Sequence, residues 1–142
     1  MLVRPGGAGG QLEVLLQHRA EWSDQGGTWA LPGGALHAGE DAVTGALREA
    51  VEEAGVDPAG VGVVGRHVLD HGLWRYTTVV ALVCGPQHPA PKDRESLAIA
   101  WVGTDDVPAL PLLGAFRAAW PALLDIARRE RQPGGPRRPR EQ

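Results

Sequence analysis

Gly34-Ala-Leu-His-Ala-Gly-Glu40 is followed after seven residues by Arg48-Glu-Ala-Val-Glu-Glu-Ala-Gly-Val56. This stretch fixes five charged positions and two glycines within twenty-three residues. Because several residue types must coincide at fixed spacings, the pattern is far more specific than a lone glycine-rich loop. It therefore decides how the rest of the chain is interpreted.

The segment from Asp41 to Ala54 has the periodicity of a helix. Glu40 and Asp41 lie where the positive end of a helix favours anions, and Gly55 is a natural left-handed terminator. One stripe of this helix is apolar and consists of Ala42, Val43, Ala46, Leu47, Ala50, Val51 and Ala54. The sequence thus predicts a helix over residues 41–54 with its apolar stripe against a core.

Three glutamates, Glu49, Glu52 and Glu53, follow one another at i, i+3 and i+4, on the side opposite the apolar stripe. Each like-charge pair costs an isolated helix about 0.2–0.5 kcal/mol. Arg48 can orient Glu52 or reach back to Glu40, but one guanidinium cannot neutralise three acids. Mg²⁺ prefers carboxylate oxygens together with water and phosphate oxygens, so the cluster predicts a magnesium site for a diphosphate. Taken alone, such a cluster is more often a solvated helix face.

The loop before this helix, Trp29-Ala-Leu-Pro-Gly-Gly34, contains Pro32 and two glycines. These residues allow a sharp turn that presents backbone carbonyls without obstruction by a Cβ atom. Gly45 lies one turn before Glu49, where its missing side chain leaves room for metal ions and a diphosphate. A glycine that the helix merely tolerates is the alternative.

The whole stretch resembles the signature box of the Nudix (MutT-type) hydrolases. Its pattern is Gly, five residues, Glu, seven residues and then Arg-Glu-aliphatic-any-Glu-Glu-any-Gly-aliphatic. Every position matches, with Ala50 smaller than usual. The resemblance implies an α/β/α sandwich with a mixed β-sheet flanked by helices. It also implies a cytoplasmic pyrophosphohydrolase that uses Mg²⁺, for which Mn²⁺ can substitute.

The resemblance also suggests residue roles. The implied metal ligands are Glu49, Glu52, Glu53 and the Gly34 carbonyl, and the implied catalytic residues are Arg48, Glu49, Glu53 and Glu95. Glu49 or Glu95 is the candidate general base. Glu95 precedes Trp101 by six residues, at a spacing comparable to that of a metal-site acid in MutT-type members, although an ordinary loop carboxylate is the alternative.

Substrate contacts are expected from Gly33, Gly34, Trp29 and His71. Trp29 could stack on a base, as aromatic rings do, or pack beneath the glycine-rich loop. His71, and also His67, could contact a leaving group, but isolated histidines near turns are more often structural or exposed.

Composition indicates one domain, residues 1–131, in a chain of 142 residues with 43% hydrophobic residues. The basic Pro/Gly/Arg-rich segment 132–142 is predicted to be a disordered tail. A net charge of −3 argues against general affinity for nucleic acid or anionic membranes. The single cysteine, Cys84, is expected in the core and suits a reducing cytoplasm, and no apolar stretch approaches the roughly 20 residues that span a bilayer.

Strands are predicted on both sides of the box. Met1–Arg4 and Leu12–His18 can form a hairpin, and an apolar run with weak alternation predicts a strand covered on both faces. After the box, strands are predicted over Val61–Leu69, Leu73–Val83 and Leu97–Val102. The run with weak alternation is Leu73–Val83. A second helix is expected to begin at Pro121, within the helical pattern from Phe116 to Glu130.

The substrate class follows from the resemblance only in part. The first choice is a (deoxy)nucleoside triphosphate, including an oxidised one, cleaved to monophosphate and pyrophosphate. ADP-ribose or another nucleotide sugar or dinucleotide comes second, and Asp70-His71-Gly72 stands where many ADP-ribose hydrolases have a proline. A non-catalytic nucleotide-sensing module is the contrasting class, and removal of a 5′ diphosphate from RNA through the basic tail is a weaker one. The resemblance also allows a homodimer.

Overall fold

The computed structural model describes residues 1–6, 10–33, 37–70, 72 and 75–131. Gly34, His71, Trp74 and the tail 132–142 lie outside the described residues. The described strands are β1 (Leu2–Pro5), β2 (Leu12–Arg19), β3 (Trp29–Ala30), β4 (Val61–Asp70), β5 (Arg75–Val83) and β6 (Ser96–Gly103). The helices are α1 (Ala42–Ala54) and α2 (Gly114–Arg131), with short 3₁₀ turns at Pro58–Gly60 and Val107–Ala109.

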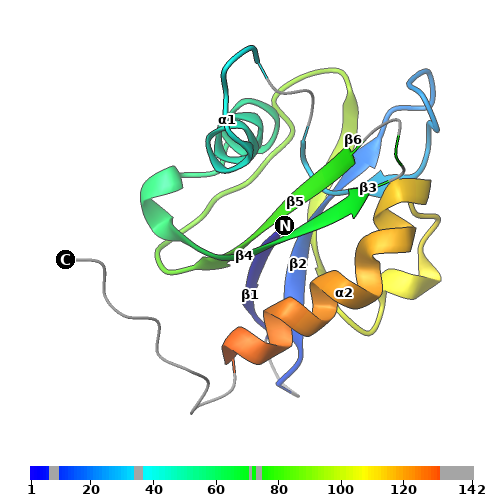
Figure 1. Ribbon diagram of the computed structural model, residues 1–142. Helices are drawn as coiled ribbons and strands as arrows, with labels where there is room; N and C mark the ends of the chain where they lie inside the picture. The colour runs from blue at the N-terminus through cyan, green and yellow to red at the C-terminus, as the bar shows by residue number, and fades with distance from the viewer. Residues whose placement is uncertain (7–9, 34–36, 71, 73–74, 132–142) are drawn as a thin grey trace.

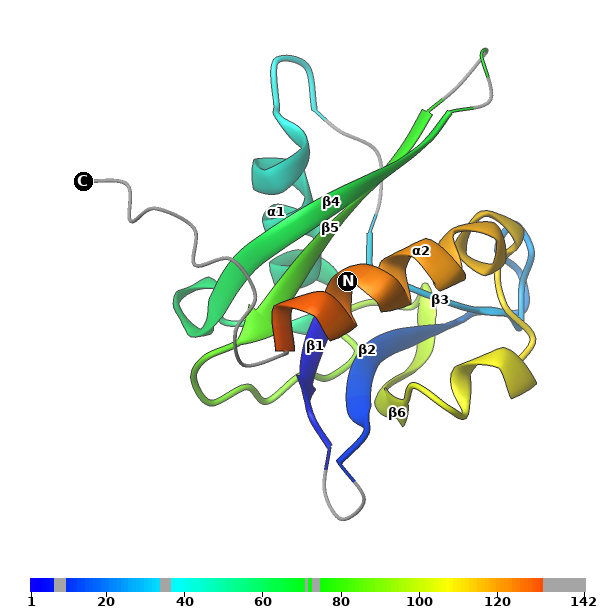
Figure 2. The ribbon, with the colours of Figure 1, turned by 60° about the horizontal axis from the view of Figure 1, so that its bottom comes forward.

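The six strands form one mixed sheet in the order β3-β2-β1-β5-β4, and β6 also pairs with β2. β1 runs parallel to β5, whereas the other pairs are antiparallel. Helices α1 and α2 lie on opposite sides of this sheet (Figures 1 and 2). The predicted α/β/α sandwich with a mixed sheet is therefore confirmed, and so is the hairpin of β1 and β2.

Alternation along the strands separates the two sides of the core. Val14 and Leu16 of β2 pack in one cluster with Phe116 and Leu123 of α2. Leu15, between them, packs instead with Ala54 at the end of α1 and with Leu2 and Ala81 of the sheet. Successive strand residues point to opposite faces, so each helix receives every second side chain. Strand β5, between β1 and β4, contributes to both clusters, as its weak alternation predicts.

Helix α1 has the ends that the sequence predicts. The carboxylate of Asp41 caps the N-terminus by accepting a hydrogen bond from the Thr44 N–H at 2.8 Å. Gly55 ends the helix with φ +66°, and its N–H donates to the Val51 carbonyl. The positive φ explains why this position is a glycine.

Helix α2 begins at Gly114, so the prediction that it begins at Pro121 is wrong. Pro121 lies inside the helix but on its exposed side, where the carbonyl that would accept its missing N–H can bind water. A proline within a helix costs about 3 kcal/mol. Burial of Phe116 and Trp120, whose rings meet edge-on at 5.7 Å, offsets this with about 1.5–3 kcal/mol each.

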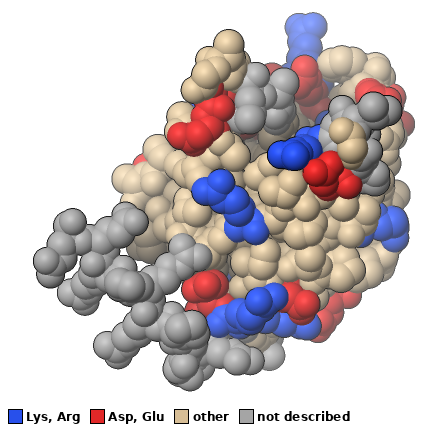
Figure 3. All heavy atoms as spheres, in the orientation of Figure 1, with Lys and Arg blue, Asp and Glu red and all other residues tan. Residues whose placement is uncertain are grey.

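Charged side chains of both signs are interspersed on the face of the molecule that Figure 3 shows. Cys84 is exposed because β5 ends one residue earlier, at Val83, so the prediction of a core cysteine is wrong. Among the described helices, none is both long enough and apolar enough to cross a bilayer.

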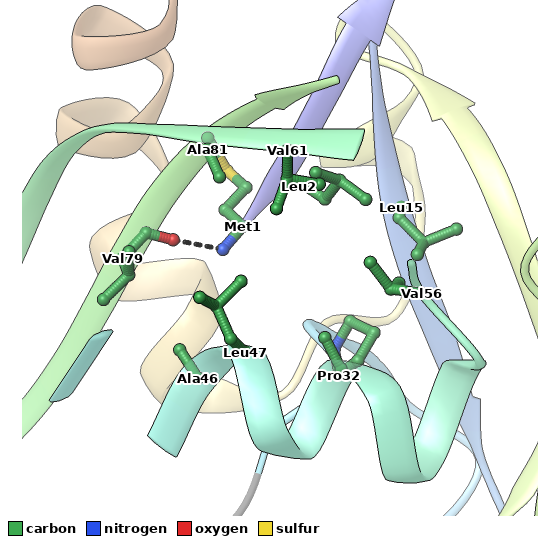
Figure 4. A pocket seen from close by; sticks show the side chains of 11 residues that line it. Met1, Leu2, Leu15, Pro32, Ala46, Leu47, Val56, Val61, Val79 and Ala81 are labelled. Atoms are coloured by element: carbon green, nitrogen blue, oxygen red, sulfur yellow. Dashed lines mark hydrogen bonds between the residues drawn. The ribbon is translucent and has the colours of Figure 1, made fainter. Parts of the chain in front are cut away.

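A small apolar cavity of about 50 Å³ lies between α1 and the sheet (Figure 4). Figure 4 shows Ala46 and Leu47 of α1 facing Leu2 and Val61 across it. Ala50 also lines the cavity, at the position where the sequence pattern usually has a bulkier aliphatic residue. The small side chain of Ala50 thus accounts for part of the unfilled space.

We expect Ala50→Val to raise the free energy of unfolding by about 1 kcal/mol, because the two added carbons fill part of this cavity. Urea unfolding followed by circular dichroism measures the change. Ala118→Val, at an exposed position of α2, is the control and should lower stability by about 0.5 kcal/mol through helix propensity alone. An Ala50→Val protein no more stable than the control would contradict this account.

Candidate active site

Glu53 is buried, with only 9% of its surface exposed. Its Oε2 accepts a hydrogen bond of 3.0 Å from the Gly33 N–H. The chain after β5 covers the same end of the helix, where the Lys92 N–H donates to the Glu53 carbonyl. The prediction that the three glutamates occupy the side away from the core is therefore wrong for Glu53, and the Val51 side chain of the apolar stripe is 41% exposed instead.

Burial raises the pKa of the Glu53 carboxyl to about 7. The Gly33 N–H acts in the opposite direction, while the nearby charges of Glu49 and Asp93 raise the pKa further. A carboxylate held among other acids in a buried place is costly unless a positive group compensates it. The local electrostatics therefore favour binding of a cation beside Glu53.

Arg48 ties the other acids together. Its guanidinium makes a two-pronged contact with Glu40, at 2.8 Å from Nε to Oε2 and 3.0 Å from Nη2 to Oε1. Its Nη1 donates to Glu49 at 2.8 Å and to Glu52 at 3.0 Å. The sequence predicts that Arg48 contacts Glu52 or Glu40, and the structure shows that it binds both. Arg48 therefore joins the loop before α1 to the acidic side of the helix.

A cavity of about 520 Å³ opens beside these acids, within the size range of small-molecule sites. Glu49, Gly45 and Ala42 of α1 form one wall, and Gly33 of the preceding loop adjoins them. Gly45 is buried, so its missing side chain leaves room at the cavity wall, as the sequence suggests. The remaining lining residues are Met1, Arg19, Ala30, Leu31, Pro32, Ala46, Arg75, Tyr76, Thr77, Thr78, Val79 and Leu113.

The acids at this cavity suit a hard divalent cation. Glu49 lines the cavity and the neighbouring Glu53 offers carboxylate oxygens, the donor type that Mg²⁺ and Mn²⁺ prefer. Within the described part of the chain, no three acidic, histidine or cysteine side chains form a metal cluster. Glu52 is held by Arg48 with its side chain 56% exposed. Two carboxylates completed by backbone, water and phosphate oxygens match the usual coordination of Mg²⁺.

The other predicted residues are placed as follows. Gly33 lines the cavity and binds Glu53, whereas Gly34 and His71 lie outside the described residues. The Trp29 ring stacks on His18, with centroids 4.5 Å apart, and packs against the core. Among the described cavity-lining residues, Trp29 does not occur.

Glu95 is exposed, and no contact among the described residues joins its carboxylate to the helix glutamates. The acid whose charge reaches Glu53 from this loop is Asp93, and the Asp93 carboxylate accepts a 2.9 Å hydrogen bond from the Glu95 N–H. Sequence reasoning missed Asp93. Its position two residues before Glu95, in the same polar loop, was the available signal.

The family model for the NUDIX domain matches residues 2–124. The chain belongs to the NUDIX family. A Bifidobacterium longum relative named "Nucleoside triphosphate pyrophosphatase/Nudix hydrolase fusion protein" is 50% identical over 111 residues, which are 76% of this chain and 23% of that protein. A Mycobacterium tuberculosis relative named "Putative 8-oxo-dGTP diphosphatase 3" is 41% identical over 140 residues, covering 90% of this chain and 64% of that protein.

A solved structure gives the same assignment. The crystal structure of the Nudix hydrolase RenU from M. Smegmatis is 42% identical and covers 90% of this chain and 82% of that chain, with a TM-score of 0.81. This NUDIX chain spans less than two thirds of the length of the two curated relatives. The activities of those whole proteins are therefore not assigned to this chain.

The ion pair of Glu40 with Arg48 gives this NUDIX domain a specific acid sensitivity. Hydrogen bonds from Arg48, and from the His37 backbone, lower the pKa of Glu40 from 4.5 to about 2. A pKa that is lower in the folded state contributes stability above the unfolded pKa and loses it as pH falls through the folded pKa. We therefore expect Glu40→Gln to destabilise the protein at pH 6, and this difference to shrink as pH falls from 4.5 to about 2.

Urea midpoints of the parent and of Glu40→Gln across this pH range test the expectation. Glu130→Gln, at an exposed position near the end of α2, is the control for loss of one ordinary carboxylate. A difference between Glu40→Gln and the parent that stays constant from pH 6 to the acid limit would show that the pair has no such role.

Proposed function

We propose that this chain is a divalent-cation-dependent pyrophosphohydrolase that cleaves a nucleoside triphosphate to a nucleoside monophosphate and pyrophosphate. The observation that carries the proposal is the pair of carboxylates, Glu49 and Glu53, beside a cavity of about 520 Å³ in a NUDIX domain. One end of this cavity is acidic, and a bound cation there can hold phosphate oxygens.

The acidic residues of the box, Arg48 and the two glycines before the helix have roles in this proposal. Glu49 and Glu53, with the Gly34 carbonyl, would hold the cation, for which Mg²⁺ is the first choice and Mn²⁺ the substitute. Glu52, the third predicted ligand, is bound by Arg48 and would act from the outer side of this pair. The Gly33 N–H keeps the Glu53 carboxylate in place. Arg48 orients Glu49 and Glu52 through its Nη1 contacts.

The cation, when bound, supplies charge neutralisation on the diphosphate and a lower pKa for the attacking water. Glu49 is the candidate that accepts the proton of this water, because its side chain lines the cavity while that of Glu95 has no described contact there. The new bond joins the water oxygen to one phosphorus of the diphosphate. The bond between this phosphorus and the bridging oxygen breaks, and the other product leaves with that oxygen.

The choice of a nucleoside triphosphate rests on two supports. The printed names of the Bifidobacterium and Mycobacterium relatives refer to a nucleoside triphosphate and to 8-oxo-dGTP, although the matched regions are only part of those proteins. The cavity also has room beyond the acidic end, where apolar and hydroxyl-bearing side chains and two arginines, Arg19 and Arg75, form the lining. Both fit a substrate with a phosphate chain at one end and a base at the other.

We expect Glu53→Gln to lower kcat/KM for a nucleoside triphosphate by at least about 100-fold while the protein stays folded. Glutamine has the same shape and can still accept the hydrogen bond from Gly33, but it lacks the charge that holds a cation. Pyrophosphate release across nucleoside triphosphates, oxidised guanine nucleotides, ADP-ribose and dinucleoside polyphosphates, with Mg²⁺ and with Mn²⁺, measures the effect and identifies the preferred substrate.

Glu130→Gln is again the matched control, since it removes an exposed carboxylate on α2 and should retain full turnover. Glu95→Gln separates the two candidate bases, because loss of turnover there would favour Glu95 over Glu49. Normal turnover of Glu53→Gln, or hydrolysis that needs no divalent cation, would sink the proposal. Nucleotide binding without hydrolysis would instead favour a sensing module.

A further inference from the structure

The large cavity passes through a gap in the sheet. β1 pairs with β5 at the end of that strand, where Leu2 lies opposite Ala81 and Val3 opposite Leu82. The residues of β5 from Arg75 to Val79 precede this pairing, and both their faces line the cavity. The hairpin of β4 and β5 extends away from β2 and β3 at this end (Figure 2). The cavity therefore reaches from the acidic side of α1 to the side of the sheet that α2 covers.

Two buried polar atoms near this second end have no hydrogen-bond partner among the described residues. They are the Thr78 hydroxyl oxygen and His67 Nδ1. Thr78 lines the cavity and is only 4% exposed. His67 and Thr78 lie directly opposite each other in the pairing of β4 with β5, so their side chains share one face of the sheet.

A buried polar atom without a partner is unfavourable, and natural proteins rarely retain one without a reason. Here both such atoms belong to a single cross-strand pair. A threonine hydroxyl both donates and accepts, and His67 Nδ1 does one or the other according to its tautomer. The pair can therefore satisfy a ligand group that offers adjacent donor and acceptor atoms.

The surroundings of Thr78 suit a flat ring with a polar edge. Ala30, Leu31 and Leu113 line the same cavity and give it apolar surface. Tyr76, on the same face of β5 as Thr78, adds a partly buried aromatic ring, and Arg19, whose charge acts on the Tyr76 hydroxyl, also lines the cavity. The carboxylates and glycines that fit a cation and a diphosphate lie at the opposite, α1 end of the cavity. A nucleobase, joined to its phosphates through the sugar, matches this separation of a mainly apolar end from an acidic one.

We propose that Thr78 reads the nucleobase of the substrate, through a hydrogen bond from its hydroxyl to the edge of the base, and that His67 beside it holds this hydroxyl or the base in position. The inference rests on the proposed function, since it requires a nucleotide substrate. Rotation about the Cα–Cβ bond of Thr78 can turn the hydroxyl toward the cavity without moving the backbone. Thr78 is then a specificity-determining residue, and His67 a positioning residue.

The test compares Thr78→Val, which has the same shape without the hydroxyl, with Thr78→Ser, which retains the hydroxyl. Two quantities are measured for guanine, adenine, cytosine and uracil nucleotides. These are kcat/KM for the triphosphates and, by calorimetry without a divalent cation, the Kd of the monophosphates. Thr104→Val, which removes the hydroxyl of an equally buried threonine that does not line the cavity, is the matched control.

We expect Thr78→Val to reduce the ratio of best to worst base by at least about fivefold in both measurements, as loss of one hydrogen bond predicts. Thr78→Ser and Thr104→Val should keep the parent's ratio. His67→Gln should reduce the same ratio less than Thr78→Val while leaving the KM for pyrophosphate-containing analogues without a base unchanged. An unchanged ratio in Thr78→Val, with higher stability, would overturn the proposal and leave Thr78 as an orphaned hydroxyl or the partner of a buried water only.

The two proposals fail in different ways. If the monophosphates bind with a base preference that Thr78→Val removes, but no triphosphate is hydrolysed, the assignment of Thr78 holds and the proposed hydrolysis fails. If triphosphates are hydrolysed with a base preference that ignores Thr78, the hydrolysis holds and the assignment of Thr78 fails. If the parent protein binds and hydrolyses no nucleotide, both are overturned.

Discussion

The hydrogen bond from the Gly33 N–H to the Glu53 carboxylate is the contact on which the candidate site depends. It fixes the loop that follows β3 against the last turn of α1, and it keeps an acidic side chain in a buried place. Burial alone would drive this acid toward its neutral form. A backbone N–H lowers that tendency without adding a positive side chain. The carboxylate therefore remains available to a cation, whereas a lysine or arginine partner would compete with one.

On the outer side of the helix, the positive charge of Arg48 balances the remaining acids. Its guanidinium satisfies Glu40, Glu49 and Glu52 together, so the acids farther from Glu53 are balanced within the protein. This arrangement divides the acidic cluster into a compensated part and an uncompensated part. Glu53, and the side of Glu49 that lines the cavity, belong to the second part. A cation at this site would therefore be held on the side of the acidic cluster that the arginine does not reach.

The fold class could be predicted from the resemblance of the signature box to a known family. The ends of α1 and a contact of Arg48 with Glu52 or Glu40 could be predicted because they depend on residues close together in the chain. Capping by Asp41 and the left-handed Gly55 are local, and Arg48 is one turn from Glu52. Burial of Glu53 could not be predicted in this way, because the covering segments, around Gly33 and Lys92, come from distant parts of the chain. Pro121 misled for a related reason. Its local cost is outweighed by the packing of Phe116 and Trp120, which the helical pattern alone does not quantify.

The gap in the sheet follows from the short pairing of β1 with β5. Only the later part of β5 is paired there, so its first residues are free to line a cavity from both faces. A strand whose residues face two sides of one cavity can place different chemistry at each end. On β5 this brings Thr78 to the wall opposite the acids of α1, although the two lie far apart in the sequence and no spacing rule connects them. The residues of the signature box determine how a diphosphate could be held. The side chains that would distinguish one base from another lie on β4 and β5, and the box does not specify them. Members of one family can therefore share the acidic end and still differ in what they accept at the other.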